Sequence, residues 1–118
     1  MDLEIKKIEN AIVCKVLLED FTLTNFQNIK SELEKKGYKV DTGTINNIPN
    51  YTDALVTYVD KWMWDFGTYM YELTIFIKNP KTEYPIASGH SLHGSLTRLT
   101  PKEMVKEAVS NMLGGKSE

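Results

Sequence analysis

The chain has 118 residues, of which 42% are hydrophobic and 25% are charged. This is the composition of one ordinary globular domain, and it excludes a disordered chain, which needs low hydrophobicity and a high net charge. Lysine and arginine number 14 against 16 aspartate and glutamate residues, so the formal net charge is −2, and Arg98 is the only arginine. Because a nucleic-acid-binding surface normally has a basic excess with bidentate arginines, we expect no nucleic-acid partner.

The sequence shows neither a membrane span nor a disulfide framework. Its apolar stretches are shorter than the ~18–20 residues that cross a bilayer, and Cys14 is the only cysteine, so no intramolecular disulfide is expected. The N-terminus also lacks the basic and then apolar pattern of a secretory signal. We expect a single domain over residues 1–118, with residues 114–118 as a flexible tail. Two locations stay open: the cytoplasm, or the periplasmic side of a bacterial envelope if a signal or lipid anchor has been removed.

The first half of the chain predicts a strand, a helix and a second strand. Residues 11–19 are short, apolar and rich in β-branched side chains, which indicates a buried strand. Thr24 fits the first residue of a capping box at the start of an amphipathic helix, and Gly37 is placed to end that helix. A short strand over residues 38–40 follows. Residues 41–53 are rich in glycine, asparagine and proline, so we expect a long surface connection there.

The second half of the chain predicts a hairpin, a further strand and a final helix. Residues 54–64 and 69–78 are rich in β-branched and aromatic side chains, and the glycine-containing turn between them favours a β-hairpin. In residues 69–78 apolar side chains alternate with more polar ones, and this alternation puts Tyr69 on the apolar face and Met70 on the other. Residues 84–96 are expected to form the next strand.

Two local features complete the second half. Gly89 and Gly94 are candidate positions for bulges in the strand over residues 84–96. Thr100, Pro101 and Glu103 then open the last helix as cap, first helical residue and capping-box partner. Its apolar stripe includes six side chains, Met104, Val105, Ala108, Val109, Met112 and Leu113.

The expected element order is therefore β-α-β-β-β-β-α. Two amphipathic helices each need an apolar cover, and an antiparallel meander with one apolar face supplies it. We expect the α+β class, as a two-layer sandwich in which an antiparallel sheet of four or five strands carries both helices on one face.

Few residues suggest catalysis or metal binding. His90 and His93 are the only histidines, and on a strand residues three apart point to opposite faces, so we expect no metal site from them. Asp60, Asp65 and Glu72 could suggest a carboxylate pair, but Asp65 falls at a turn, where aspartate has a local role. The sequence has no nucleophile elbow and no phosphate-binding loop. We therefore expect no catalytic residue, no bound metal and no cofactor.

Aromatic side chains are densest around the predicted hairpin. Helices can cover only one face of the sheet, so some of these side chains should lie on the open face or at the end of the hairpin. Tryptophan and tyrosine are frequent at binding hot spots because they bury a large area at little entropic cost. The alternative is that they belong to the core. The candidate contact surface comprises Tyr58, Trp62, Trp64, Tyr69 and Tyr71.

Four short segments lie in and after this hairpin: Tyr-Val-Asp-Lys-Trp-Met-Trp-Asp (58–65), Tyr-Met (69–70), Asn-Pro-Lys-Thr (79–82) and Ala-Ser-Gly (87–89). Together they resemble the core of a family of small, uncharacterised bacterial envelope lipoproteins. The resemblance covers residues 54–113 and implies a strand ending in a Trp-x-Trp-Asp turn, an antiparallel strand, a further hairpin and a closing helix. It implies no catalytic residues. The chain departs from the family by showing neither a signal nor a lipidated cysteine.

These observations favour a non-enzymatic binding or assembly domain of the bacterial cell envelope, acting through its aromatic sheet surface. The alternative is a cytoplasmic small-ligand-binding or enzyme domain that uses the His90–His93 segment. A homodimer, formed by an edge strand or by the aromatic surface, is compatible with both. The sequence identifies neither the partner nor the role of the two histidines.

Overall fold

The computed structural model describes residues 10–14, 23–43 and 48–113. The second half of the first expected strand, residues 15–19, and the expected tail at residues 114–118 lie outside the described residues. Within the described part, the elements follow the expected order β-α-β-β-β-β-α, with one short 3-10 helix added before the last helix. The predicted α+β class is confirmed.

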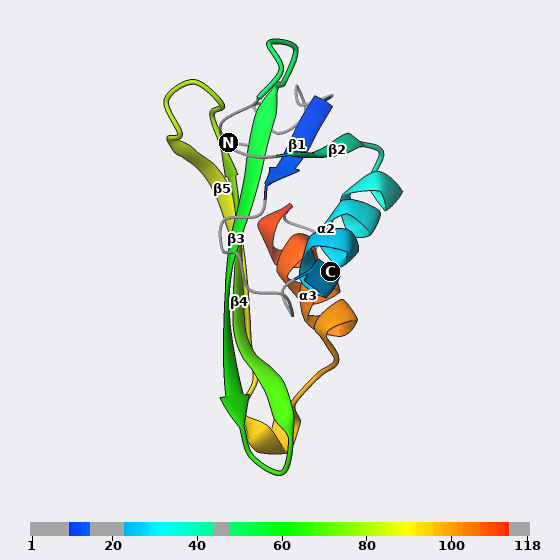
Figure 1. Ribbon diagram of the computed structural model, residues 1–118, viewed down its shortest axis with the longest axis vertical. Helices are drawn as coiled ribbons and strands as arrows, with labels where there is room; N and C mark the ends of the chain where they lie inside the picture. Colours follow the sequence, from blue (N-terminus) through cyan, green and yellow to red (C-terminus); the bar gives the residue numbers. More distant parts are fainter. Residues whose placement is uncertain (1–9, 15–22, 44–47, 114–118) are drawn as a thin grey trace.

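Five strands form one sheet in the order β2-β1-β3-β4-β5 (Figure 1). They are β1 (Asn10–Cys14), β2 (Lys39–Gly43), β3 (Ala54–Trp64), β4 (Thr68–Lys78) and β5 (Pro85–Leu92). The two longest, β3 and β4, form the predicted antiparallel hairpin, and β5 continues the antiparallel meander. None of the helices in the described part of the chain is long and apolar enough to cross a membrane.

The expectation of a wholly antiparallel sheet is wrong for the first two strands. β1 pairs in parallel with both β2 and β3. For the pairing of β1 with β2, the cause is the helix α2 (Leu23–Lys35) that connects them. A helix between two strands carries the chain back along the sheet, so the second strand runs in the same direction as the first. The three elements then form a parallel β-α-β unit. The sheet is therefore mixed, with a parallel half and an antiparallel half.

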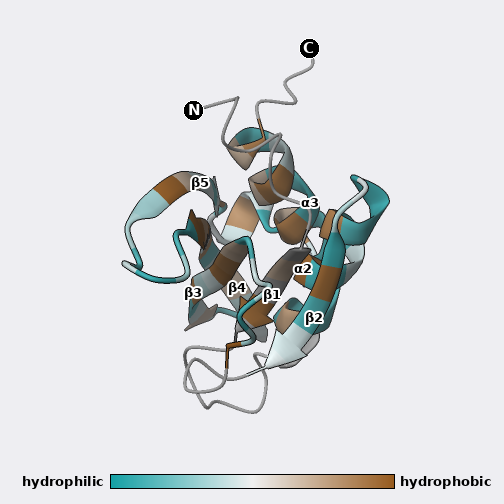
Figure 2. Cartoon of the chain, turned by 90° about the horizontal axis from the view of Figure 1, so that it is seen from above, coloured by the Kyte–Doolittle hydropathy of each residue, from teal (hydrophilic) through white to brown (hydrophobic). Residues whose placement is uncertain are grey.

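Both helices lie on the same face of the sheet, as predicted. α3 (Pro101–Met112) packs on β4 and β5, whereas α2 packs on α3 and on the parallel strands (Figure 1). From above, the strands form a curved row from β5 to β2 beside the helix pair (Figure 2). The core between the layers contains fully buried side chains from every layer, among them Ile29, Leu33, Val56, Leu73, Ile75, Met104 and Val109.

The ends of the helices follow local sequence signals. Thr100 caps α3 as predicted: its hydroxyl accepts a hydrogen bond from the Glu103 amide at 3.2 Å, and the Glu103 carboxylate accepts one from the Thr100 amide at 2.9 Å. α2 ends before Gly37, whose φ of +99° is the left-handed conformation expected there. α2 begins at Leu23, one residue before the cap expected at Thr24.

Gly89 lies where α3 comes closest to the sheet. It pairs regularly with Ile75, so the expected bulge at this glycine is absent, and the irregularity between β4 and β5 falls at Ile77 and Lys78 instead. A Cβ atom at position 89 would lie 2.0 Å from the Ala108 carbonyl oxygen and 2.6 Å from the Met112 Cβ atom. The glycine is therefore required by the close approach of helix and strand and not by an irregular strand.

Candidate functional site

The predicted contact residues of β3 run along one face from the core to solvent. Tyr58 is buried in the main core, with 2% of its surface exposed, Trp62 is half-buried against that core, and Trp64 is 76% exposed. All three lie on the face that carries the helices, because alternate residues of a strand share a face. The helices end before the hairpin does (Figure 1), so the same face emerges into solvent near Trp64. Of these three residues, Trp64 is the one available to a partner.

A β-bulge changes the faces predicted for β4. Lys61 pairs with Glu72 and Trp62 pairs with Met70, so Tyr71 is an extra residue in β4 with no partner in β3. The interpretation that Met70 lies on the polar face is wrong for this reason. The bulge turns Met70 toward the helices, where it is 1% exposed. Tyr71 is half-buried beside the bulge.

Tyr69 is buried by Arg98, a residue that the sequence patterns did not select. The guanidinium carbon lies 4.3 Å from the centroid of the Tyr69 ring, which is a cation–π contact. The guanidinium also donates to the Asp65 carbonyl oxygen at 2.7 Å and to the Ser95 hydroxyl at 2.9 Å. Arg98 therefore joins the hairpin turn, β4 and the 3-10 helix η2 (Ser95–Thr97).

The turn between β3 and β4 is tight and has two residues with positive φ. The Asp65 amide donates to the Gly67 carbonyl oxygen at 2.9 Å. Gly67 has φ +116° and Phe66 has φ +55°. Left-handed backbone suits glycine but costs other L-residues about 1–2 kcal/mol. Phe66 nevertheless holds its aromatic side chain 94% exposed at the tip of the hairpin.

Four large apolar side chains are exposed around this end of the molecule, and we refer to them as the hairpin-end surface. Met63 and Trp64 come from the end of β3, Phe66 from the turn, and Leu96, which is 99% exposed, from η2. The hydrogen bond from Arg98 to Asp65 holds η2 beside the turn, and both lie beyond the helices in Figure 1. Met63 and Trp64 are neighbours in β3 and so point to opposite faces, which means that the four side chains surround the end of the hairpin. Exposed apolar side chains that lie near one another mark interaction sites more often than scattered ones do.

The two histidines lie on different sides of β5, as expected from strand geometry. His90 Nε2 donates to the Glu72 carboxylate at 2.6 Å on the helix-free face, where Lys61 also lies 3.4 Å from Glu72. The hydrogen bond from His90, and then the one from Lys61, lower the pKa of Glu72 below its usual value. Through these two contacts with Glu72, the trio cross-links β3, β4 and β5 at the surface.

His93 points to α3 instead. Its Nε2 atom lies 2.8 Å from the Glu107 carboxylate, and the Ser91 hydroxyl donates to the same oxygen at 2.5 Å. The hydrogen bond from Ser91, and then the one from His93, lower the pKa of Glu107. Ser91 gives its hydrogen to the carboxylate and not to the imidazole, so this is not the arrangement of an activated serine nucleophile. The cluster ties β5 to α3.

The carboxylates considered for acid–base chemistry do not converge. Asp60 is buried on the helix side and accepts a hydrogen bond from Asn25 Nδ2 at 2.7 Å. Glu72 lies on the opposite face, and Asp65 lies at the turn. Among the described residues, no group of three histidine, cysteine, aspartate or glutamate side chains could hold a metal ion.

Comparisons with known proteins give likeness in fold alone. No protein-family model matches the chain, and no curated protein matches it. One similar solved structure is the dodecamer of a single-residue variant of PelC from Paraburkholderia phytofirmans, with a TM-score of 0.61 and 13% identity over 92% of this chain and 88% of that one. Another is a putative neuraminyllactose-binding hemagglutinin homolog from Helicobacter pylori, with a TM-score of 0.50 and 14% identity over 95% of this chain and 87% of that one.

Proposed function

We propose that the chain is a non-enzymatic binding and assembly domain of the bacterial cell envelope that associates with further copies of itself through the hairpin-end surface. The observation that carries this proposal is the exposure of Trp64, Phe66 and Leu96 at one end of the domain. Exposure of several large apolar side chains to water is unfavourable, and burial against a partner would remove these side chains from water.

The backbone of Phe66 supports the same proposal. Folding of this turn would be served better by glycine or asparagine, which accept a positive φ at lower cost. The exposed ring of Phe66 also contributes little to the core of the chain. Burial of the Phe66 ring in an assembly would offset the cost of its backbone conformation and would explain why an aromatic residue stands at this position.

The proposed interface is of modest size. An aromatic side chain buries about 150–250 Å² in an interface, so Trp64 and Phe66 together supply roughly half of the ~800 Å² per partner that a standard stable interface needs. We therefore expect self-association that is reversible and depends on concentration. The likeness in fold to PelC, whose structure is described as a dodecamer, supports a second copy as the partner.

Light scattering coupled to size-exclusion chromatography tests the assembly. Over a concentration series, the apparent mass of the wild type should rise, and Trp64→Ser should shift it toward that of the monomer without lowering the melting temperature. Tyr84→Ser is the matched control, because Tyr84 is 73% exposed but lies before β5, at the other end of the sheet. A wild type that stays monomeric at every concentration, or equal loss of association in both variants, would contradict the proposal.

The envelope location rests on the resemblance of residues 54–113 to envelope lipoproteins and is tested separately. Fractionation of the native cells, with an antibody to the protein, should find it in the periplasmic or membrane fraction. Recovery in the cytoplasmic fraction alone would refute the location and leave the proposed self-association to be judged by the mass measurement.

A further inference from the structure

The hairpin-end surface is convex. Phe66 stands at the tip of the hairpin with 94% of its surface exposed, and the hairpin extends beyond the helices (Figure 1). Met63 and Trp64 point to opposite faces of β3, so the apolar side chains surround the tip and do not form a flat patch. Stable interfaces are closely complementary in shape. Two convex tips would bury little area against each other, so this surface needs a concave counterpart.

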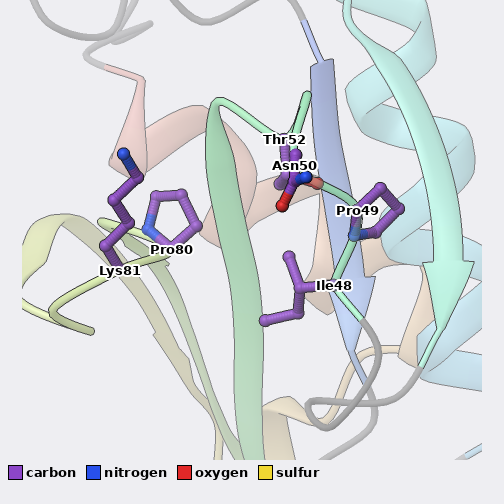
Figure 3. Close-up of a pocket in the computed structure, with 6 residues that line it drawn as sticks. All are labelled: Ile48, Pro49, Asn50, Thr52, Pro80 and Lys81. Atoms are coloured by element: carbon purple, nitrogen blue, oxygen red, sulfur yellow. The ribbon is translucent and has the colours of Figure 1, made fainter.

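A cavity of about 240 Å³ lies at the opposite end of β3 and β4 (Figure 3). The beginning of β3 pairs with the end of β4, with Leu55 opposite Lys78, so the segment that enters β3 and the turn that leaves β4 come together there. Each of the two strands has 11 residues, which separates their ends by about 35 Å. One copy therefore cannot bring its own hairpin tip to its own cavity, whereas a second copy can.

Three apolar residues form much of the cavity. Ile48 lines it and packs against Leu55, whose side chain is fully buried. Pro49 and Pro80 line it from the two different segments, and Figure 3 shows their rings on either side of Ile48. Apolar side chains that converge on one concave site favour an apolar occupant.

The size of the cavity suits an aromatic side chain. A cavity of about 150 Å³ can hold benzene, so 240 Å³ accommodates the ring of Phe66. Both lining segments are held by local hydrogen bonds: the Thr52 amide donates to the Pro49 carbonyl oxygen at 3.2 Å, and the Asn79 side-chain oxygen accepts from the Lys81 amide at 2.8 Å. The cavity is therefore largely preformed, which lowers the entropic cost of binding.

The charges at the two ends of the hairpin are complementary. Asp65 precedes Phe66, and its amide and carbonyl groups bond to Gly67 and Arg98, which leaves its carboxylate outside these contacts. Lys81 is exposed where it lines the cavity. Within the described part of the chain, neither the Asp65 carboxylate nor the Lys81 ammonium forms an ion pair. Opposite charges on two surfaces steer their association and fix its orientation.

We propose that the Phe66 ring of one copy enters this cavity of a second copy, between Pro49 and Pro80, with Asp65 beside Lys81 of that second copy. The inference rests on the proposed self-association and names the surface that receives the hairpin end. The contact is head-to-tail, because two different surfaces meet. A free tip and a free cavity remain at the two ends of each assembly, so further copies add until a ring closes or a filament grows.

Complementation of two defective chains tests the head-to-tail contact. Phe66→Asn removes the tip and keeps the cavity, whereas Asn50→Trp fills the cavity from an exposed lining position and keeps the tip. In sedimentation equilibrium, each variant alone should associate at least about tenfold more weakly than the wild type. An equal mixture should recover the wild-type affinity and stop at two chains, because each mixed pair has one intact tip and one intact cavity.

Two controls accompany these variants. Lys102→Trp places the same new side chain on the exposed surface of α3 and should associate as the wild type does. Tyr84 does not line the cavity, so Tyr84→Ser should also associate as the wild type does. A mixture that associates as weakly as its components, or Asn50→Trp that associates as tightly as the wild type, would overturn the head-to-tail contact and leave the proposed self-association standing. A wild type that stays monomeric at every concentration would refute both.

Charge reversal tests the same contact without filling the cavity. Lys81→Glu places a carboxylate opposite Asp65 of the neighbouring copy and should weaken association about three- to fivefold. Adding Asp65→Lys to the same chain restores opposite charges and should restore the affinity. A double variant that associates no more tightly than Lys81→Glu would show that these two ends do not meet.

Discussion

Replacement of Gly89 by alanine should destabilise the domain by forcing α3 away from the sheet. The new methyl group would lie 2.0 Å from the Ala108 carbonyl oxygen, 2.6 Å from the Met112 Cβ atom and 2.9 Å from the Met112 amide nitrogen. These atoms belong to the helix backbone or are attached directly to it, so no side-chain rotation relieves the clash. Overpacking of this kind costs about 1–3 kcal/mol, and a clash with backbone belongs at the upper end.

Thermal unfolding followed by circular dichroism measures the effect. For a chain of this length, 1 kcal/mol corresponds to roughly 3–6 °C, so Gly89→Ala should melt about 8–15 °C below the wild type. Gly94→Ala is the matched control, because a Cβ atom there would have no neighbour within 4 Å and its φ is −80°. If Gly89→Ala melted within about 2 °C of the control, the close approach of α3 to β5 would be refuted.

Three further changes test other parts of the structure. Met112→Asp puts a charge where the side chain is 5% exposed, so the melting temperature should fall by more than about 10 °C; an unchanged melt would mean that α3 does not pack there. Arg98→Lys loses the stacking on Tyr69 and the fork of hydrogen bonds, so hydrogen exchange at the turn and η2 should accelerate, and unchanged exchange would contradict the linking role. The pKa of Glu107 is lowered in the folded chain, so the charged form stabilises the fold above its unfolded pKa and this stabilisation is lost as pH falls through the folded pKa. Glu107→Gln should therefore lower the urea midpoint at neutral pH, and the difference between the variant and the wild type should shrink as the pH falls through the folded pKa of Glu107; a difference that stays the same at every pH would exclude the carboxylate as the cause.

Local signals in the sequence were sufficient for most elements of the fold. The capping box at Thr100 and the stripe from Met104 to Met112 predicted α3, because both depend on residues a few positions apart. The β3–β4 hairpin was likewise predicted from strand composition and a glycine-containing turn. In each case the signal and the structure involve the same neighbouring residues, so little knowledge of distant contacts was needed.

The parallel pairing of β1 was missed because the sequence was interpreted as one continuous meander. The strand–helix–strand order around α2 was already predicted, and it is the usual signature of parallel neighbours. The bulge at Tyr71 could not be predicted in this way. The alternation of apolar and polar residues over 69–78 continues through the bulge, so no local sequence signal marks its position.

The candidate site was predicted in part. The density of aromatic residues pointed to the hairpin that carries the hairpin-end surface, but the burial of each aromatic side chain depends on what covers it. Tyr58 lies under the helices and Tyr69 lies under Arg98, whereas Phe66 and Leu96, which the sequence analysis did not select, are exposed. A contact between residues 65 and 98 spans more than a quarter of the chain, and spacing along the sequence could not reveal it.

The most direct test of the proposed function is sedimentation equilibrium of Phe66→Asn beside the wild type, with thermal melts of the same samples. Asparagine accepts the left-handed backbone and removes the exposed ring, so the variant should be about 1 kcal/mol more stable than the wild type. We predict that it nevertheless associates at least about tenfold more weakly. A variant that is equally or more stable and that associates as tightly as the wild type would contradict the account, because the ring at the tip of the hairpin would then have no part in assembly.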